Sequence, residues 1–399
     1  MKEIYISKNK DIAQIVLVEN GNLIEKYEEN DKIKRLEGKI YLGKVQNVLP
    51  GMQAAFVDIG EEKNTFIHLK DILPKVNIVK EKAPEEEKNI KKIVKIGDRL
   101  LIQVKRDATN MKGAKVSTHI SLTSRYFVLM PDVEIRTISQ KIEDQKEKER
   151  LNKIIDEILP KNYGVIIRTS AEGKNKEELE NDLNKSIKEW KRIRKIKEDE
   201  SSQVPSCVYE GQTFIEKLLI DLVDKDINKI VVNTKKHYNE VVKILKKLEE
   251  NIIVELKENE NILKIYDMEE QIEKTKQRKI WLKCGGFITI DKTEALTAID
   301  VNSGKFTGSK DLEQTVFKVN SEASIEIAKQ LRLRDIGGII IIDYIDMSNE
   351  DHKKQIIKVL EENLKQDRSK TQIIGFSKLN LLEMTRKHMK GGEWIYDAS

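Results

Sequence analysis

The feature that most constrains the fold is a strand, helix, strand pattern in the last third of the sequence. The strand "ALTAID" ends on Asp300, the strand "IIIID" ends on Asp343, and residues 311–334 between them have helical periodicity. A crossover helix that joins two strands of one sheet makes those strands parallel. Parallel strands place their C-terminal ends at one edge of the sheet, where such folds bind ligands. We therefore predict that the two aspartates lie close together.

Two carboxylates at one edge of a sheet predict a cation site. They repel each other unless a proton or a cation lies between them. Mg²⁺ fits best, because it takes oxygen ligands and often binds proteins through only one or two carboxylates. Asn302 follows Asp300 at the next position on the same side of the strand, so it could orient a ligand or a water. A cation held in this way activates water and neutralises charge at a phosphorus centre.

The same residues allow a purely structural explanation. Asp, Asn, Ser and Gly are common in turns, so Asp300 could begin a turn and Asp343 could cap the next helix. Asp346 is a weaker third acid, and capping the helix at "NEDH" is its simpler role. The matching positions of Asp300 and Asp343 make the cation site as good an explanation as the structural one. The residues alone leave both open.

The sequence around the aspartates has α/β character. "GGFITID" and "QIIGFS" are expected strands, and "NEDHKKQIIKVLEENLKQD" is an expected helix. Four consecutive isoleucines in "GGIIIIDYIDM" indicate a strand buried on both faces, as in a parallel or mixed sheet. The connecting helix has one packed face formed by Phe317, Ser324, Ile327, Ala328 and Leu331.

In the rest of the chain the predicted secondary structure differs from one segment to the next. Five short strands separated by turns over residues 37–121 suggest a small Greek-key barrel. An N-terminal hairpin turns at Asn20-Gly21 and needs further strands to bury a face, which the alternating helices and strands of residues 208–278 could supply. Between these segments, "GVIIRTSAEG" is an expected strand. It precedes a helix whose start is signalled by Asn175 and Glu178.

Composition limits the class of protein. Charged residues make up 35% of the chain, and the net charge of +5 is too small to indicate a nucleic-acid partner by itself. Cys207 and Cys284 are far apart, which argues against a disulfide framework or a cysteine zinc site and predicts a reducing, intracellular setting. The N-terminus lacks an apolar core of signal-peptide length, and no apolar stretch of about 18 residues occurs. We therefore expect a cytoplasmic protein without a membrane span.

Several long motifs together point to a known family. The most specific is "TEALTAIDVNSGKFTG", followed by "DLEQTVFKVNSEASIEIAKQLRLRDIGGIIIIDYIDM". "AAFVDIG", "SRYFVLMP", "IIRTSAEGK" and "LLEMTRK" accompany it in the expected order and at the expected spacing. Over nearly its whole length the chain resembles the catalytic half of the RNase E/G family of bacterial endoribonucleases.

The resemblance implies an α/β and β multidomain architecture. Its pieces are an RNase H-like fold that begins at 1–36, an inserted OB-fold RNA-binding barrel at 37–121, a sensor for an RNA 5′-monophosphate at 122–207, the second part of the RNase H-like fold at 208–278, and a DNase I-like α/β catalytic subdomain at 279–399. The RNase H-like fold carries no active site in this family. Its split into two parts would explain the N-terminal hairpin.

The resemblance also implies roles for individual residues. Asp300 and Asp343 match the family's Mg²⁺ ligands, and Asn302 matches an asparagine that positions the attacking group. The residues that match the 5′-phosphate sensor are Arg168, Thr169 and Val128. An arginine offers a planar fork to phosphate oxygens, and a neighbouring hydroxyl adds a hydrogen bond. The alternative for Arg168 is that it only anchors a neighbouring helix through an acidic partner.

Four barrel residues match RNA contacts of the family. Phe56 and Phe66 match aromatic residues on which bases stack, and Lys105 and Lys112 match basic contacts. Packing inside the barrel is the alternative for the two phenylalanines, because aromatic residues in strands usually pack. A solvated loop is the alternative for the two lysines.

One departure from the family concerns zinc. Family members usually carry a Cys-Pro-x-Cys pair soon after "LLEMTRK", where two chains share one zinc ion. This sequence continues "KHMKGGEWIYDAS" without that pair, so either it stops short of the pair or this member lacks the link. Mg²⁺ is therefore the expected cofactor, zinc has no support from the cysteines, and the expectation of a homodimer is weakened.

The favoured function is a Mg²⁺-dependent endoribonuclease that cuts single-stranded RNA and leaves 5′-phosphate and 3′-hydroxyl ends. We expect it to prefer 5′-monophosphorylated substrates and to act in rRNA processing and mRNA decay. One alternative is an RNA-binding protein without catalytic activity, in which the acids are structural. Another is a Mg²⁺-dependent phosphoesterase that acts on DNA or on a small molecule.

Overall fold

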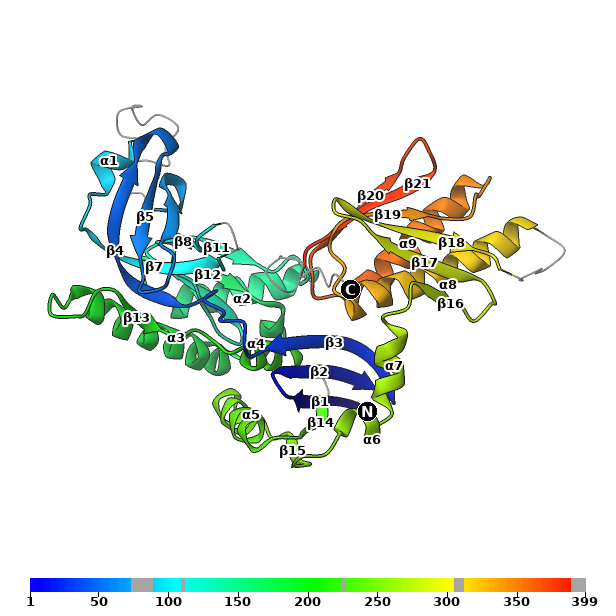
Figure 1. Ribbon diagram of the computed structural model, residues 1–399, viewed down its shortest axis with the longest axis horizontal. Helices are drawn as coiled ribbons and strands as arrows, with labels where there is room; N and C mark the ends of the chain where they lie inside the picture. Colours follow the sequence, from blue (N-terminus) through cyan, green and yellow to red (C-terminus); the bar gives the residue numbers. More distant parts are fainter. Residues whose placement is uncertain (73–88, 109–111, 224–226, 305–311, 389–399) are drawn as a thin grey trace. The chain divides into compact units, whose positions relative to one another are not determined.

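A computed structural model describes residues 1–72, 89–108, 112–223, 227–304 and 312–388. The chain forms two compact units (Figure 1). The first unit contains residues 1–32, 226–242 and 251–399, and the second contains residues 33–225 and 243–250. Each unit is built around two β-sheets within the described residues.

The N-terminal hairpin finds its partner strands far along the chain. In one sheet of the first unit the strand order is β15, β14, β1, β2, β3. These strands are β1 (Lys2–Asn9), β2 (Ile12–Glu19), β3 (Asn22–Asn30), β14 (Ile227–Val232) and β15 (Ile253–Leu256). The turn falls at Asn20 and Gly21, both with positive φ, as a tight hairpin turn requires. The expected hairpin and its sheet are confirmed, and helices α5 (Lys235–Leu248), α6 (Ile262–Ile265) and α7 (Met268–Lys274) follow β14 and β15.

The second unit contains a closed five-stranded barrel, which is compatible with an OB-like fold. Its strands are β4 (Ile40–Leu49), β5 (Ala54–Asp58), β6 (Thr65–His68), β8 (Lys115–Ser117) and β7 (Arg99–Arg106), and β7 pairs back onto β4. A further strand, β13 (Ser206–Tyr209), also pairs with β4, which the sequence did not predict. Helix α1 (Ile90–Ile93) precedes β7.

The other sheet of the second unit lies against two helices. Its strands are β9 (Leu122–Thr123), β10 (Phe127–Pro131), β11 (Arg136–Ile138) and β12 (Tyr163–Ile167), and its helices are α2 (Gln145–Ile158) and α3 (Lys176–Glu198). The expected helix start is confirmed, because Asn175 and Glu178 form reciprocal capping hydrogen bonds. Helix α4 (Phe214–Leu222) follows β13.

The sheet that carries the two aspartates is mixed, with the order β16, β17, β18, β19, β21, β20. Its strands are β16 (Lys279–Trp281), β17 (Phe287–Lys292), β18 (Leu296–Asn302), β19 (Gly338–Asp343), β20 (Thr371–Phe376) and β21 (Leu381–Arg386). Helices α8 (Leu312–Leu333) and α9 (Glu350–Leu364) pack against each other beside this sheet (Figure 1). Strands β18 and β19 are parallel, as predicted.

The prediction that the isoleucine strand is buried on both faces was wrong. Ile340 and Ile342 are fully buried in the core shared with α8 and α9, but Ile339 on the other face is 51% exposed. The two helices supply the apolar partner for one face only, so alternate residues of β19 remain open. We call this second side the open face of the sheet.

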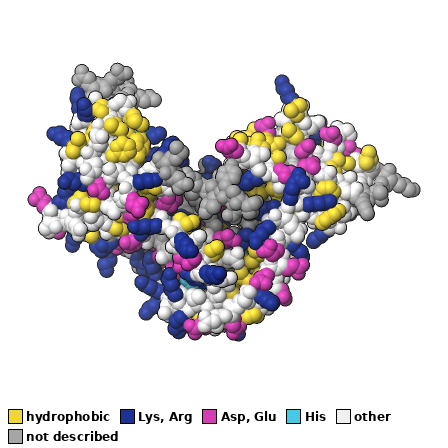
Figure 2. Space-filling model, viewed as in Figure 1, with side chains coloured by type: hydrophobic (Ala, Val, Ile, Leu, Met, Phe, Trp, Pro, Cys, Tyr) yellow, Lys and Arg dark blue, Asp and Glu magenta, His cyan; other side chains and the backbone are white. Residues whose placement is uncertain are grey.

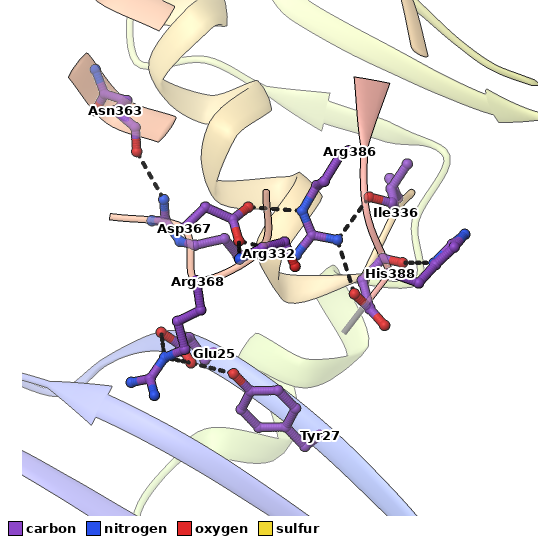
Figure 3. A network of polar contacts seen from close by, with 11 residues as sticks. Glu25, Tyr27, Arg332, Ile336, Asn363, Asp367, Arg368, Arg386 and His388 are labelled. Atoms are coloured by element: carbon purple, nitrogen blue, oxygen red, sulfur yellow. Dashed lines mark hydrogen bonds and ion pairs between the residues drawn. The ribbon is translucent and has the colours of Figure 1, made fainter. Parts of the chain in front are cut away.

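A polar network ties β3 to the aspartate-bearing part of the first unit (Figure 3). Arg368, between α9 and β20, donates to Glu25 of β3 at 3.2 Å, and Tyr27 also donates to Glu25. Burial, followed by the charge of Glu25, raises the pKa of the Tyr27 hydroxyl above its usual range. Nearby, the Arg386 guanidinium is 1% exposed and binds both Asp367 and Asp335.

Candidate active site

The aspartates of β18 and β19 form the centre of the candidate site. Asp300 and Asp343 are directly opposite each other in the parallel ladder, so their side chains lie on the same face of the sheet. Both are exposed, whereas their neighbours Ile299 and Ile342 are buried. The alternation of side chains along each strand therefore puts the two carboxylates on the open face.

Hydrogen bonding and charge couple the site residues. The Asn302 amide Nδ2 donates to Asp300 Oδ2 at 2.6 Å, so these two side chains lie together as predicted. Burial, and then the charges of Asp300 and Asp346, raise the pKa of the Asp343 carboxyl above its usual range. Ionising Asp343 therefore costs free energy in this arrangement, and a bound cation would offset that cost.

The donor atoms suit a hard cation. Two carboxylates and the amide of Asn302 offer oxygen ligands, and Mg²⁺ commonly binds through one or two carboxylates and fills its other positions with water or phosphate oxygens. In the described ranges no group of three or more His, Cys, Asp or Glu side chains is placed to hold a metal ion. Mg²⁺ needs only one or two carboxylates besides water, so the donor set of Asp300 and Asp343 is compatible with this ion.

The structural explanation of the acids does not fit the local geometry. Asp300 does not begin a turn, because β18 continues to Asn302. Neither Asp343 nor Asp346 caps the following helix. Asn349 is the N-cap of α9, and its side chain accepts from the Asp351 amide at 2.9 Å.

Of the three predicted sensor residues in the second unit, Val128 lies on β10, and Arg168 and Thr169 directly follow the adjacent strand β12. Val128 of β10 is opposite Ile166 of β12, two positions before Arg168, so Val128 and Arg168 share a face. Arg168 donates to the carbonyl of Ser124 at 2.8 Å and forms an ion pair with Asp221 of α4. The Thr169 hydroxyl lies 3.0 Å from that of Ser139. The acidic partner that the sequence left open is therefore present.

The two barrel phenylalanines lie outside the barrel core. Phe56 and Phe66 are direct cross-strand partners, and their rings meet edge to face at 6.0 Å. The core beneath them contains Ala55, Val57 and Ile67. Hydrophobic side chains gather on this part of the barrel, in the region of β5 and β8 (Figure 2). This position leaves both rings half-exposed and accessible to a base.

The two barrel lysines differ in environment. Lys112 is exposed. Lys105 is half-buried and donates to Gln103 at 2.6 Å and to Ser121 at 3.3 Å. Burial lowers the pKa of its ammonium group to about 8, and its side chain lines a pocket of about 190 Å³.

Comparisons with known proteins decide the family. A sequence model of the Ribonuclease E/G family matches residues 121–389. Ribonuclease G of Salmonella typhimurium is 38% identical over 396 residues, which cover 97% of this chain and 80% of that protein. The chain belongs to the ribonuclease E/G family. Ribonuclease E of Nostoc sp. is 34% identical over 96% of this chain and 56% of its own length.

Family membership gives the enzyme class. This ribonuclease E/G family member is an endoribonuclease, a hydrolase of RNA phosphodiester bonds. Among its described helices, none combines the length and apolar character needed to cross a lipid bilayer.

The position of the phenylalanines leads to a prediction. Phe56→Ala and Phe66→Ala should each weaken RNA binding by about 1–3 kcal/mol, because each would remove one stacking surface. Since both rings lie outside the core, the variants should keep the wild-type thermal transition. Val57→Ala is the matched control, because this neighbour is fully buried and its truncation should lower the thermal midpoint. Loss of folding in either phenylalanine variant would assign that ring to packing.

Proposed function

We propose that this chain is a Mg²⁺-dependent endoribonuclease whose catalytic residues are Asp300, Asn302 and Asp343. The observation that carries the proposal is the direct pairing of Asp300 with Asp343 in the parallel ladder, with Asn302 hydrogen-bonded to Asp300. Two carboxylates in register on an open sheet face are unfavourable without a cation. The family hydrolyses RNA phosphodiester bonds, and a cation at this position could stabilise the charge that develops in that reaction.

In the proposed reaction, Asp300 and Asp343 would hold Mg²⁺, which would supply Lewis-acid stabilisation of the charge that develops at the scissile phosphate. Asn302 orients the carboxylate of Asp300 through its amide and offers a further polar group to the attacking water. The water oxygen bonds to phosphorus, the bond from phosphorus to the 3′ oxygen breaks, and a proton reaches that oxygen. The products carry a 5′-phosphate and a 3′-hydroxyl.

The proposed substrate is single-stranded RNA in RNA processing and decay. The half-exposed ring pair of Phe56 and Phe66 offers stacking surfaces to unpaired bases, which a duplex would not present. Lys105 and Lys112 would contact the phosphate backbone. In this proposal the barrel is the OB-fold RNA-binding module, and the aspartate-bearing sheet is the DNase I-like subdomain. The sheet of β1–β3 with β14 and β15 is the RNase H-like part without an active site.

The general test is cleavage of a 5′-monophosphorylated, AU-rich oligonucleotide by the pure chain. Cleavage in Mg²⁺ that stops in EDTA and resumes when Mg²⁺ is restored would support the proposal. RNA binding without cleavage under every divalent cation tested would instead indicate an RNA-binding protein without activity.

A preference for 5′-monophosphorylated RNA is the expected consequence of the sensor residues. Arg168 would pair with the terminal phosphate, which carries charge that a 5′-hydroxyl lacks. A charge-assisted hydrogen bond contributes about 1.5–3 kcal/mol, or roughly ten- to a hundredfold in apparent affinity. Arg168→Ala should therefore remove most of the preference and leave the slower reaction of 5′-hydroxyl RNA nearly intact.

The ion pair of Arg168 with Asp221 provides the matched control. Asp221→Ala breaks the same ion pair but leaves the guanidinium in place. Kinetics on the two RNAs should show the preference lost in Arg168→Ala and retained in Asp221→Ala. Equal loss in both variants would mean that Arg168 only anchors α4.

A further inference from the structure

Three residues of β16 and β17 form a compact cluster next to the candidate active site. Trp281 is directly opposite Phe287, and their rings meet edge to face at 5.3 Å. The Lys279 ammonium lies 4.1 Å from the centroid of the Trp281 ring and 3.6 Å from that of Phe287. We call Lys279, Trp281 and Phe287 the aromatic strip. No pattern in the sequence indicated it.

The aromatic strip and the catalytic residues share the open face of the sheet. Phe287 of β17 is directly opposite Asn302 of β18, and antiparallel partners point to the same side. Trp281 lies one strand further out. Neighbouring strands are about 4.8 Å apart, so the backbone of Trp281 lies about 10 Å from that of Asn302. The strip is therefore continuous with the site along one row of the sheet.

The exposure of Trp281 is unusual for its size. The side chain is 61% exposed on an edge strand of three residues, although burying a tryptophan is a large source of stability. Its alternation with half-buried Ile280 fixes the ring on the open side instead of in the core. A large aromatic surface beside a cation and a catalytic site suits a ligand with both an apolar face and a negative charge.

We propose that the aromatic strip binds an unpaired base of the RNA strand next to the scissile phosphodiester. This inference rests on the proposed catalytic role of Asp300 and Asp343. A base would stack on the exposed Trp281 surface, and the adjoining phosphate would meet the ammonium of Lys279. Phe287, between Trp281 and Asn302, completes the path from the stacked base to the reacting bond. The strip thus holds the strand in position for cleavage and favours single-stranded substrates.

Binding measured without cleavage tests the strip separately from the chemistry. We expect Trp281→Ala to weaken binding of a fluorescent single-stranded oligonucleotide in EDTA about five- to a hundredfold, the effect of losing one stacked base. Trp281→Phe should recover most of this affinity, because a phenyl ring can still stack. Ile374→Ala is the control, since Ile374 on the opposite edge strand β20 is also 61% exposed. Equal affinity of wild type and Trp281→Ala would overturn the proposal.

Photocrosslinking locates the base on the strip. An oligonucleotide with 5-iodouridine at single positions along a mapped cleavage site should crosslink to Trp281 only from a position adjacent to that site. A crosslink from a distant position, or none from adjacent ones, would contradict the proposal. In Mg²⁺, Trp281→Ala should raise KM more than it lowers kcat, as expected for a residue that binds substrate and transition state alike.

These outcomes separate the strip from the catalytic proposal. If Asp343→Asn kept full cleavage while the Trp281 crosslink and affinity loss were observed, the catalytic assignment of Asp343 would fail and the strip would remain a base-binding site beside the cleaved bond. If Asp343→Asn lost cleavage while Trp281→Ala bound RNA normally, only the strip would fail.

Discussion

Asp343→Asn is expected to lower the cleavage rate at least about a hundredfold, because the loss of a cation ligand removes several kcal/mol of transition-state stabilisation. Asp300→Asn should have the same effect, since the two carboxylates are equivalent partners in the ladder. RNA affinity in EDTA should stay close to wild type in both variants. The measurement is single-turnover cleavage in Mg²⁺ at saturating enzyme.

Thermal stability distinguishes a catalytic role of Asp343 from a structural one. Burial and two neighbouring acids raise the pKa of Asp343, so ionising this group costs free energy in the folded protein at neutral pH. Asp343→Asn removes that cost and should keep or slightly raise the thermal midpoint without Mg²⁺. Asp291→Asn is the control, because this acid lies on neighbouring strand β17 and pairs with Arg278. A large drop in the midpoint of Asp343→Asn would mean that the carboxylate holds the fold.

The second large effect concerns the buried arginine of β21. Arg386→Met should lower the free energy of unfolding by about 3–5 kcal/mol, because it leaves a buried carboxylate without its cation. That carboxylate is Asp367, which is 1% exposed and accepts from Arg386 Nε at 2.7 Å. Arg386 also donates to the Ile336 carbonyl at 2.9 Å (Figure 3). One substitution therefore breaks bonds to the loop between α8 and β19 and to the loop between α9 and β20. Urea denaturation followed by circular dichroism measures the change.

An exposed arginine directly before β16 provides the comparison. Arg278 pairs with Asp291 at 2.5 Å, and both side chains are largely exposed, so Arg278→Met should cost only about 0–1 kcal/mol. Adding Asp367→Leu to Arg386→Met should restore part of the lost stability, because the buried carboxylate that has lost Arg386 is then removed. Equal effects of Arg386→Met and Arg278→Met would show that burial of the pair contributes little.

The parts of the fold that were predictable have strong local signals. The strand, helix, strand pattern around Asp300 and Asp343 determines a parallel pair, and the Asn20-Gly21 turn determines the hairpin of β2 and β3. The alignment of the two aspartate-bearing strands then follows from the alternation of buried and open residues along each of them. The proximity of the two acids could therefore be expected from the sequence alone.

The errors have a common physical origin. Four isoleucines indicate a strand, but whether both its faces are buried depends on which helices cover the sheet, and here they cover one. β13 has only four residues and pairs with a strand far away in the sequence, so no local period marks it. The aromatic strip was missed, and the acidic partner of Arg168 was left open without being identified as Asp221, because both depend on residues brought together only by folding.

Binding of Mn²⁺ in place of Mg²⁺, followed by electron paramagnetic resonance of the free ion, tests the central claim most directly. If Asp300 and Asp343 hold the catalytic cation, wild type and Asp291→Asn should bind Mn²⁺ at a site whose occupancy parallels RNA cleavage as the ion is titrated. Asp300→Asn and Asp343→Asn should lose both that site and the cleavage. Unchanged Mn²⁺ binding in either variant, with cleavage at the wild-type rate, would contradict the account.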